Sequence, residues 1–75
     1  MMMIYILILD DDDYRTYQVV SDNVEGTVTV DKQTHMAESQ GQFSLMFSKE
    51  FIEKLAIGTL KFKTNPPKRF VYGVG

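Results

Sequence analysis

Met3-Ile-Tyr-Ile-Leu-Ile-Leu9, followed without a break by Asp10-Asp11-Asp12-Asp13, is the stretch that decides the fold. The branched Cβ of isoleucine restricts χ1 against a helical turn but packs well on a pleated surface, so the run predicts a strand. Full burial of such side chains is worth roughly 1.5–3 kcal/mol each, and we therefore expect this strand at the centre of a sheet. Unpaired carboxylates are costly to bury, so we expect the core to end at Leu9.

Both faces of this strand are apolar, because side chains alternate between the faces of a sheet. One face carries Met3, Tyr5, Leu7 and Leu9, and the other carries Ile4, Ile6 and Ile8. A single short helix covers only one of these faces. We therefore expect either that the sheet curls into a partly closed barrel or that two copies pack together, and we favour the homodimer.

Length and composition predict one small domain. The chain has 75 residues and no cysteine, which excludes a disulfide framework and a thiolate zinc site. No positive charge precedes the apolar run, and the run is too short to cross a bilayer. We expect a cytoplasmic protein without a membrane segment.

The net charge of −2 hides an asymmetry between the two parts of the chain. Residues 1–31 contain seven acidic residues and one basic residue, whereas residues 32–75 contain three acidic and seven basic residues, so the parts carry −6 and +4. If the fold keeps the two parts separate, the molecule has an acidic end and a basic end that steer charged partners.

The remaining pattern completes an α+β fold of order β-β-β-β-α-β-β. We expect a small antiparallel twisted sheet or partly closed barrel with one short helix, in a single domain spanning residues 1–75. Further strands are expected at residues 14–20, 27–31, 42–47, 59–63 and 69–74, a helix at residues 49–57, and the longest loop at residues 32–42. In the third strand Val28 and Val30 should point inward, and Thr27 and Thr29 outward.

The helix is predicted from its start and stop signals. Ser48 is a good N-cap, Glu50 lies in the first turn, and Phe47 and Ile52 occupy the positions of a hydrophobic staple. Gly58 is the expected C-terminal stop. The stripe expected to face the core consists of Phe51, Ile52, Leu55 and Ala56.

Residues 6–15, Ile-Leu-Ile-Leu-Asp-Asp-Asp-Asp-Tyr-Arg, resemble the opening of a response-regulator receiver domain. That resemblance implies acidic residues that hold Mg²⁺ for phosphoryl transfer after the first strand. The chain departs from the family directly afterwards, because a strand-forming segment follows and β/α alternation never develops.

Catalytic and metal-binding motifs are not apparent. His35 is the only histidine and lies in the predicted polar loop, and the five glycines are scattered rather than grouped into a phosphate loop. A calcium loop begun at Asp10 would require glycine where Arg15 stands. We predict a protein that is not an enzyme and that has no cofactor and no catalytic or metal-binding residue.

The acidic run and the tyrosine beside it are the leading candidate site. Asp10, Asp11, Asp12 and Asp13 repel one another, which a positively charged partner would relieve, and Tyr14 offers a flat anchor. We predict a non-catalytic protein-binding chain whose acidic hairpin tip docks on a basic surface of another protein. Short, cysteine-free, acidic inhibitors of nucleic-acid enzymes, often encoded by phages and mobile elements, have this composition.

Two alternatives use other features of the chain. Basic residues interleaved with aromatic rings near the C-terminus are typical of single-stranded nucleic-acid binders, and the residues concerned are Lys61, Lys63, Lys68, Arg69 and Tyr72. The other alternative is a structural subunit of a homo-oligomeric assembly.

Overall fold

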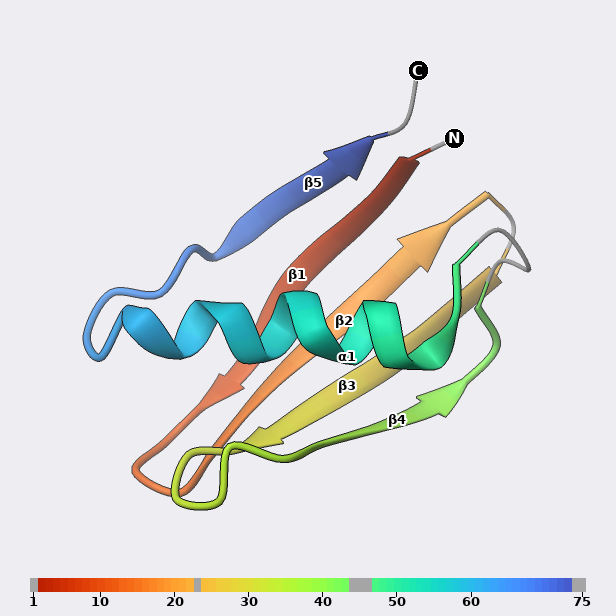
Figure 1. Ribbon diagram of the computed structural model, residues 1–75. Coiled ribbons are helices and arrows are strands. Elements are labelled where there is room, and N and C mark those ends of the chain that lie inside the picture. Colours follow the sequence, from red (N-terminus) through yellow and green to blue (C-terminus); the bar gives the residue numbers. More distant parts are fainter. Residues whose placement is uncertain (1, 23, 44–46, 74–75) are drawn as a thin grey trace.

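The computed structural model describes residues 2–22, 24–43 and 47–73. Its elements form one antiparallel sheet of order β4-β3-β2-β1-β5, with a helix lying across one face (Figure 1). The elements are β1 (Met2–Asp10), β2 (Tyr14–Ser21), β3 (Val24–Asp31), β4 (Ala37–Gly41), α1 (Lys49–Gly58), the 3₁₀ turn η1 (Thr59–Lys61) and β5 (Arg69–Gly73). The α+β class is confirmed. The sheet is open, so the barrel alternative is wrong.

The apolar run forms β1, an interior strand between β2 and β5, but the middle strand of the five is β2. Met3 and Tyr5 are buried beneath the helix layer, Leu7 is half-buried, and Leu9 is 45% exposed. The core therefore ends two residues earlier than the sequence pattern predicts.

A β-bulge explains why Leu9 leaves the core. Leu7 pairs with Tyr17 and Leu9 pairs with Thr16, so Ile8 is an extra residue in β1. An extra residue reverses the alternation of side chains that follow it. Leu9 therefore turns to the open face, and Asp10, paired with Arg15, turns to the helix face.

The second strand agrees with the prediction, and the third begins at Val24, three residues earlier than predicted. Val28 and Val30 are buried as expected, while Thr27 and Thr29 are half-exposed. The fourth strand is misplaced in the prediction. Strand β4 lies within the segment predicted to be the longest loop, because pairing with β3 outweighs the low strand propensity of its polar residues. Of the predicted strand at residues 42–47, Gln42 and Phe43 follow β4 without strand structure, Phe47 lies in a bend, and residues 44–46 lie outside the described residues.

Helix α1 begins as predicted. The Ser48 hydroxyl accepts a hydrogen bond from the Phe51 backbone N–H at 3.1 Å. Ile52 and Ala56 are fully buried against the sheet, and Phe51 and Leu55 are half-buried. Gly58 is not the C-terminal stop that the sequence predicts. Its φ of −58° is helical, and the chain continues from it directly into η1.

The predicted strand at residues 59–63 is wrong. Residues 59–61 form the turn η1, and Phe62, expected inside, is 41% exposed. The final strand is confirmed to Gly73, and Val74 lies outside the described residues. On the helix face Phe70 stacks on Tyr5 with ring centroids 4.4 Å apart. Among the described residues no helix is long and apolar enough to span a membrane.

Gly26 allows a close approach between the backbones of β3 and β4. A Cβ at Gly26 would lie 2.6 Å from the Gln40 backbone oxygen and 2.6 Å from the Phe43 ring, whereas a Cβ at Gly58 would meet no atom within 4 Å.

We predict that Gly26→Ala lowers the free energy of unfolding by about 1–3 kcal/mol, because the backbone must move to make room for the methyl group. The matched Gly58→Ala should raise it by about 0.5–1 kcal/mol. Urea denaturation measures both, and equal effects would contradict this packing.

Candidate functional site

The acidic hairpin between β1 and β2 is held in shape by one of its own carboxylates. Asp11 Oδ1 accepts hydrogen bonds from the backbone N–H groups of Asp13 at 2.9 Å and Tyr14 at 2.8 Å. The Asp11 backbone N–H donates to the Tyr14 carbonyl oxygen at 3.0 Å. Aspartate commonly closes turns in this way, so Asp11 is a structural residue of the hairpin.

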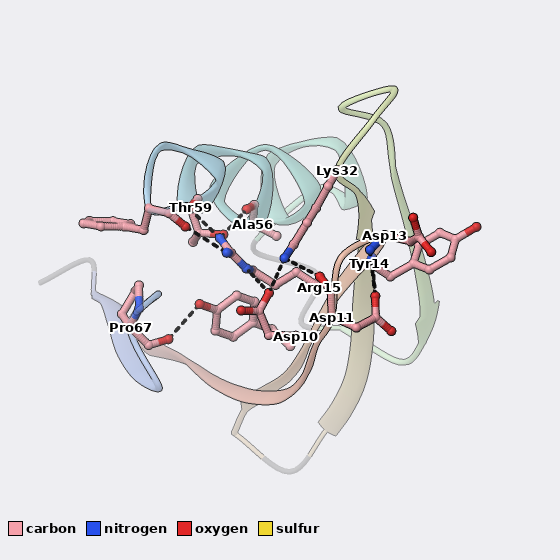
Figure 2. Close-up of polar contacts among 11 residues, drawn as sticks. Asp10, Asp11, Asp13, Tyr14, Arg15, Lys32, Ala56, Thr59 and Pro67 are labelled. Atoms are coloured by element: carbon pink, nitrogen blue, oxygen red, sulfur yellow. Dashed lines mark hydrogen bonds and ion pairs between the residues drawn. The ribbon is translucent and has the colours of Figure 1, made fainter. Parts of the chain in front are cut away.

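The neighbouring carboxylate forms ion pairs with two basic residues (Figure 2). Asp10 Oδ1 lies 2.8 Å from Arg15 Nε and 2.8 Å from Lys32 Nζ. Lys32 Nζ also donates to the Asp11 carbonyl oxygen, and its backbone N–H donates to the Asp13 carbonyl oxygen at 2.9 Å. These contacts join the acidic hairpin to the turn that follows β3.

Arg15 connects this hairpin to the end of the helix. Its side chain is 1% exposed, which is unusual for a charged residue. Nη1 donates to the Thr59 carbonyl oxygen at 2.6 Å and to Thr59 Oγ1 at 3.3 Å, and Nη2 donates to the Phe62 carbonyl oxygen at 2.8 Å. The cation therefore satisfies carbonyl groups at the C-terminal end of a helix, where the helix dipole favours positive charge.

The pKa values of the two engaged carboxyls are shifted downward. Burial on its own raises the pKa of Asp10, but hydrogen bonds and charges from Arg15 and Lys32 outweigh it and hold that pKa below its usual range. Backbone N–H groups of Tyr14 and Asp13 stabilise the charged form of Asp11 and lower its pKa. Both carboxylates thus serve the fold before any partner binds.

The part of the candidate site available to a partner is smaller than the sequence predicts, because the carboxylates of Asp10 and Asp11, although exposed, already bind groups of the chain itself. Asp12 and Asp13 are exposed, and beside them Tyr14 is 46% exposed and Met36, from the turn after β3, is 70% exposed. A shallow hollow of about 430 Å³ lies next to Tyr14 and Met36, and Asp31 and Glu38 also line it. We call Asp12, Asp13, Tyr14 and Met36 the acidic tip. Sequence reasoning missed Met36, because the turn that brings it beside Tyr14 follows another strand.

The acidic and basic parts of the chain are not kept apart. Asp12, Lys32, His35 and Lys63 line one surface hollow of about 470 Å³, together with Arg15 and Leu60. The loop that follows the helix therefore brings positive charge to the end of the sheet where the acidic hairpin lies. The expected acidic end and basic end are replaced by a mixed surface in which the acidic tip forms one side.

The basic residues of the alternative site do not share a hairpin. Lys61 belongs to η1, Lys63 and Lys68 lie in the loop before β5, and Arg69 begins β5 on the face away from the helix. Tyr72 is half-buried on the helix face, in edge contact with Phe47 and Phe51. Phe62, with Lys61 Nζ 5.2 Å from its ring centroid, remains the exposed ring near these cations.

A metal-binding cluster is not seen in the described part of the chain. Within residues 2–22, 24–43 and 47–73, no group of three or more His, Cys, Asp and Glu residues could hold a metal ion. His35 is exposed in the turn after β3.

Comparison with family models, with curated proteins and with solved structures found no match to this chain.

The Arg15 contacts generate a stability prediction. Arg15→Met leaves Asp10 and the Thr59 and Phe62 carbonyls without their donor, and we expect the free energy of unfolding to fall by about 3–5 kcal/mol. Asp10→Asn removes one charge but leaves the contacts of Arg15 with the two carbonyls, and it should lower the free energy of unfolding by about 1.5–3 kcal/mol. The control Arg69→Met changes an exposed arginine and should shift stability by less than about 0.5 kcal/mol.

Denaturant titrations followed by circular dichroism measure all three variants at one pH. If Arg15→Met were as stable as Arg69→Met, the buried guanidinium would not hold the helix end.

Proposed function

We propose that this chain is a non-catalytic binding protein that docks its acidic tip on a basic surface of another protein. The observation that carries the proposal is the grouping of two exposed carboxylates, Asp12 and Asp13, with two exposed apolar side chains, Tyr14 and Met36. Aromatic residues and methionine are enriched at protein interfaces, and tyrosine is frequent among residues whose loss weakens binding strongly.

The four aspartates have two different roles, and this difference supports the proposed use. Asp10 and Asp11 hold the hairpin, and Lys32 contacts Asp10 and the Asp11 carbonyl. Asp12 and Asp13 therefore face solvent on a hairpin that is already ordered. An ordered docking loop loses less conformational entropy on binding, and its negative charge speeds encounter with a basic partner.

An inhibitory role fits the same chemistry. A basic protein surface that binds nucleic-acid phosphates is complementary to a rigid hairpin that presents carboxylates beside an aromatic ring. By covering such a surface, this small domain would exclude the nucleic acid without any catalytic step. Within the proposal, the partner is a nucleic-acid-binding protein and the mode of action is steric and electrostatic competition.

The test uses affinity capture from the native host with variants of the exposed residues alone. Asp12→Asn combined with Asp13→Asn and Tyr14→Ala should lower recovery of the partner about tenfold, because losing interface anchors costs more than about 1.4 kcal/mol. Asp10 and Asp11 stay unchanged, so the hairpin remains folded. The charge-matched control, Asp22→Asn with Glu50→Gln, alters two exposed carboxylates elsewhere and should recover the partner fully.

Equal recovery of the same proteins by the tip variant and the wild type would overturn the proposal. Binding to labelled single-stranded oligonucleotides is measured in parallel across salt concentrations. Oligonucleotide binding that weakens steeply with salt and falls in a Lys61→Gln, Lys63→Gln variant would replace this proposal with the nucleic-acid alternative.

A further inference from the structure

The face of the sheet opposite α1 carries a continuous apolar surface. It consists of seven side chains from β5, β1 and β2, which we call the open-face column: Met2, Ile4, Ile6, Ile8, Leu9, Val20 and Val71. Four of them, Met2, Ile8, Leu9 and Val71, are between 44% and 55% exposed. A contiguous apolar patch of this kind on a small monomer marks an interaction surface.

The strand register builds this column. Ile4 pairs with Val20 on one side and with Val71 on the other, so the three side chains form a row across the sheet. The bulge extends the column, because Leu9 is aligned with Thr16 of the open face. Ile8 lines a shallow hollow on the same face with Gln18 and Thr27.

The polar side chains beside the column already have partners. The Thr16 and Thr29 hydroxyls lie 2.9 Å apart, and Gln18 Nε2 donates to Glu25 Oε2 at 2.7 Å. A polar group that keeps its hydrogen bond costs little to bury compared with one that loses its water and finds no partner. These side chains can therefore enter an interface with their hydrogen bonds intact, and the exposed Glu38 and Gln40 of the edge strand β4 lie farther out on the same face.

The dimensions of the face suit a second copy. Strands β1, β2 and β3 have eight or nine residues and the edge strands β4 and β5 have five each, so at about 4.8 Å between strands and about 3.3 Å per residue the face covers about 550 Å². Two such faces in contact bury about 1,100 Å² in total, just above the roughly 1,000 Å² that a specific interface needs. The molecule measures 32 × 19 × 17 Å, so this face is one of its largest surfaces.

We propose that the open face is a homodimer interface, with a two-fold axis in the plane of contact passing near Ile6. Such an axis lays β1 of each copy over β1 of the other, so apolar side chains meet apolar side chains and Ile6 meets its own equivalent. Arg69 pairs with Ile6 on the open face, and in this arrangement its long side chain extends past the edge strand β5 to reach water. The arrangement is a sheet-on-sheet sandwich with a helix on each outer face.

A second copy fits this surface better than an unrelated partner because the column lies on an interior strand. An isologous contact requires a patch that is complementary to itself, and an apolar column with polar groups beside it meets that condition without any opposite charge. The acidic tip lies at the end of the sheet, where Tyr14 shares the open face with Thr16 and lines a hollow with Thr29 and Met36. The dimer is centred on Ile6, which puts the acidic tips at the ends of the interface, and its existence does not depend on the proposed function.

Light scattering coupled to size-exclusion chromatography tests the inference. The wild-type mass should rise with concentration from 8.6 kDa toward twice that value. Ile8→Glu places a charge on a side chain that is 55% exposed in the monomer, so the fold should persist while the dissociation constant rises at least about tenfold. The control Lys54→Glu changes an exposed side chain of α1, on the opposite side of the sheet, and should dimerise as the wild type does.

Single-cysteine cross-linking locates the interface, because the chain contains no cysteine. A short bismaleimide should link Ile6→Cys into a covalent dimer and leave Lys54→Cys, on the exposed side of α1, largely monomeric. A wild-type protein that remains 8.6 kDa up to millimolar concentration would overturn the proposal. So would a dimer that Ile8→Glu does not weaken, or one that cross-links through Lys54→Cys and not through Ile6→Cys.

Discussion

The structure depends on one buried positive charge. The guanidinium of Arg15 lies between the sheet and the end of the helix, where it contacts Asp10 and the carbonyls of Thr59 and Phe62. A buried arginine is stable only if its donors have partners, so the hairpin after β1 and the turn after α1 must both come to it. The β-bulge at Ile8 meets this requirement, because it turns Asp10 to the face on which Arg15 lies.

The same constraint divides the acidic run into two parts. Asp10 and Asp11 have their pKa values lowered by groups inside the molecule, whereas Asp12 and Asp13 remain on the exposed tip. The bulge also turns Leu9 outward, which lengthens the apolar column on the open face. A single extra residue in β1 thus contributes both to the acidic tip and to the surface proposed for dimerisation.

Much of the fold follows from local patterns. The β1 and β2 strands, the inward valines of β3 and the Ser48 cap were predictable because alternation and capping are properties of short segments. Strand β4 was not, because its polar residues become a strand only through pairing with β3. Alternation along β2 places Arg15 on the same face as Tyr17 and Val19, and this signal could have identified it as buried. The carbonyls that accept its hydrogen bonds come from residues 44 and 47 positions later in the sequence, so the network itself lay beyond sequence reasoning.

The most direct measurement is an NMR pH titration of the wild-type protein that follows the Asp10 side-chain carboxyl carbon and the Arg15 Nε–H together. If Arg15 neutralises Asp10 inside the folded protein, both signals should change at one midpoint below about 3.9, the ordinary pKa of aspartate. Hydrogen bonds that persist in the charged state should also keep the Arg15 Nε–H slow to exchange with water above that midpoint. An Asp10 carboxyl that titrates at the ordinary value, with an Arg15 Nε–H that exchanges freely, would contradict this account.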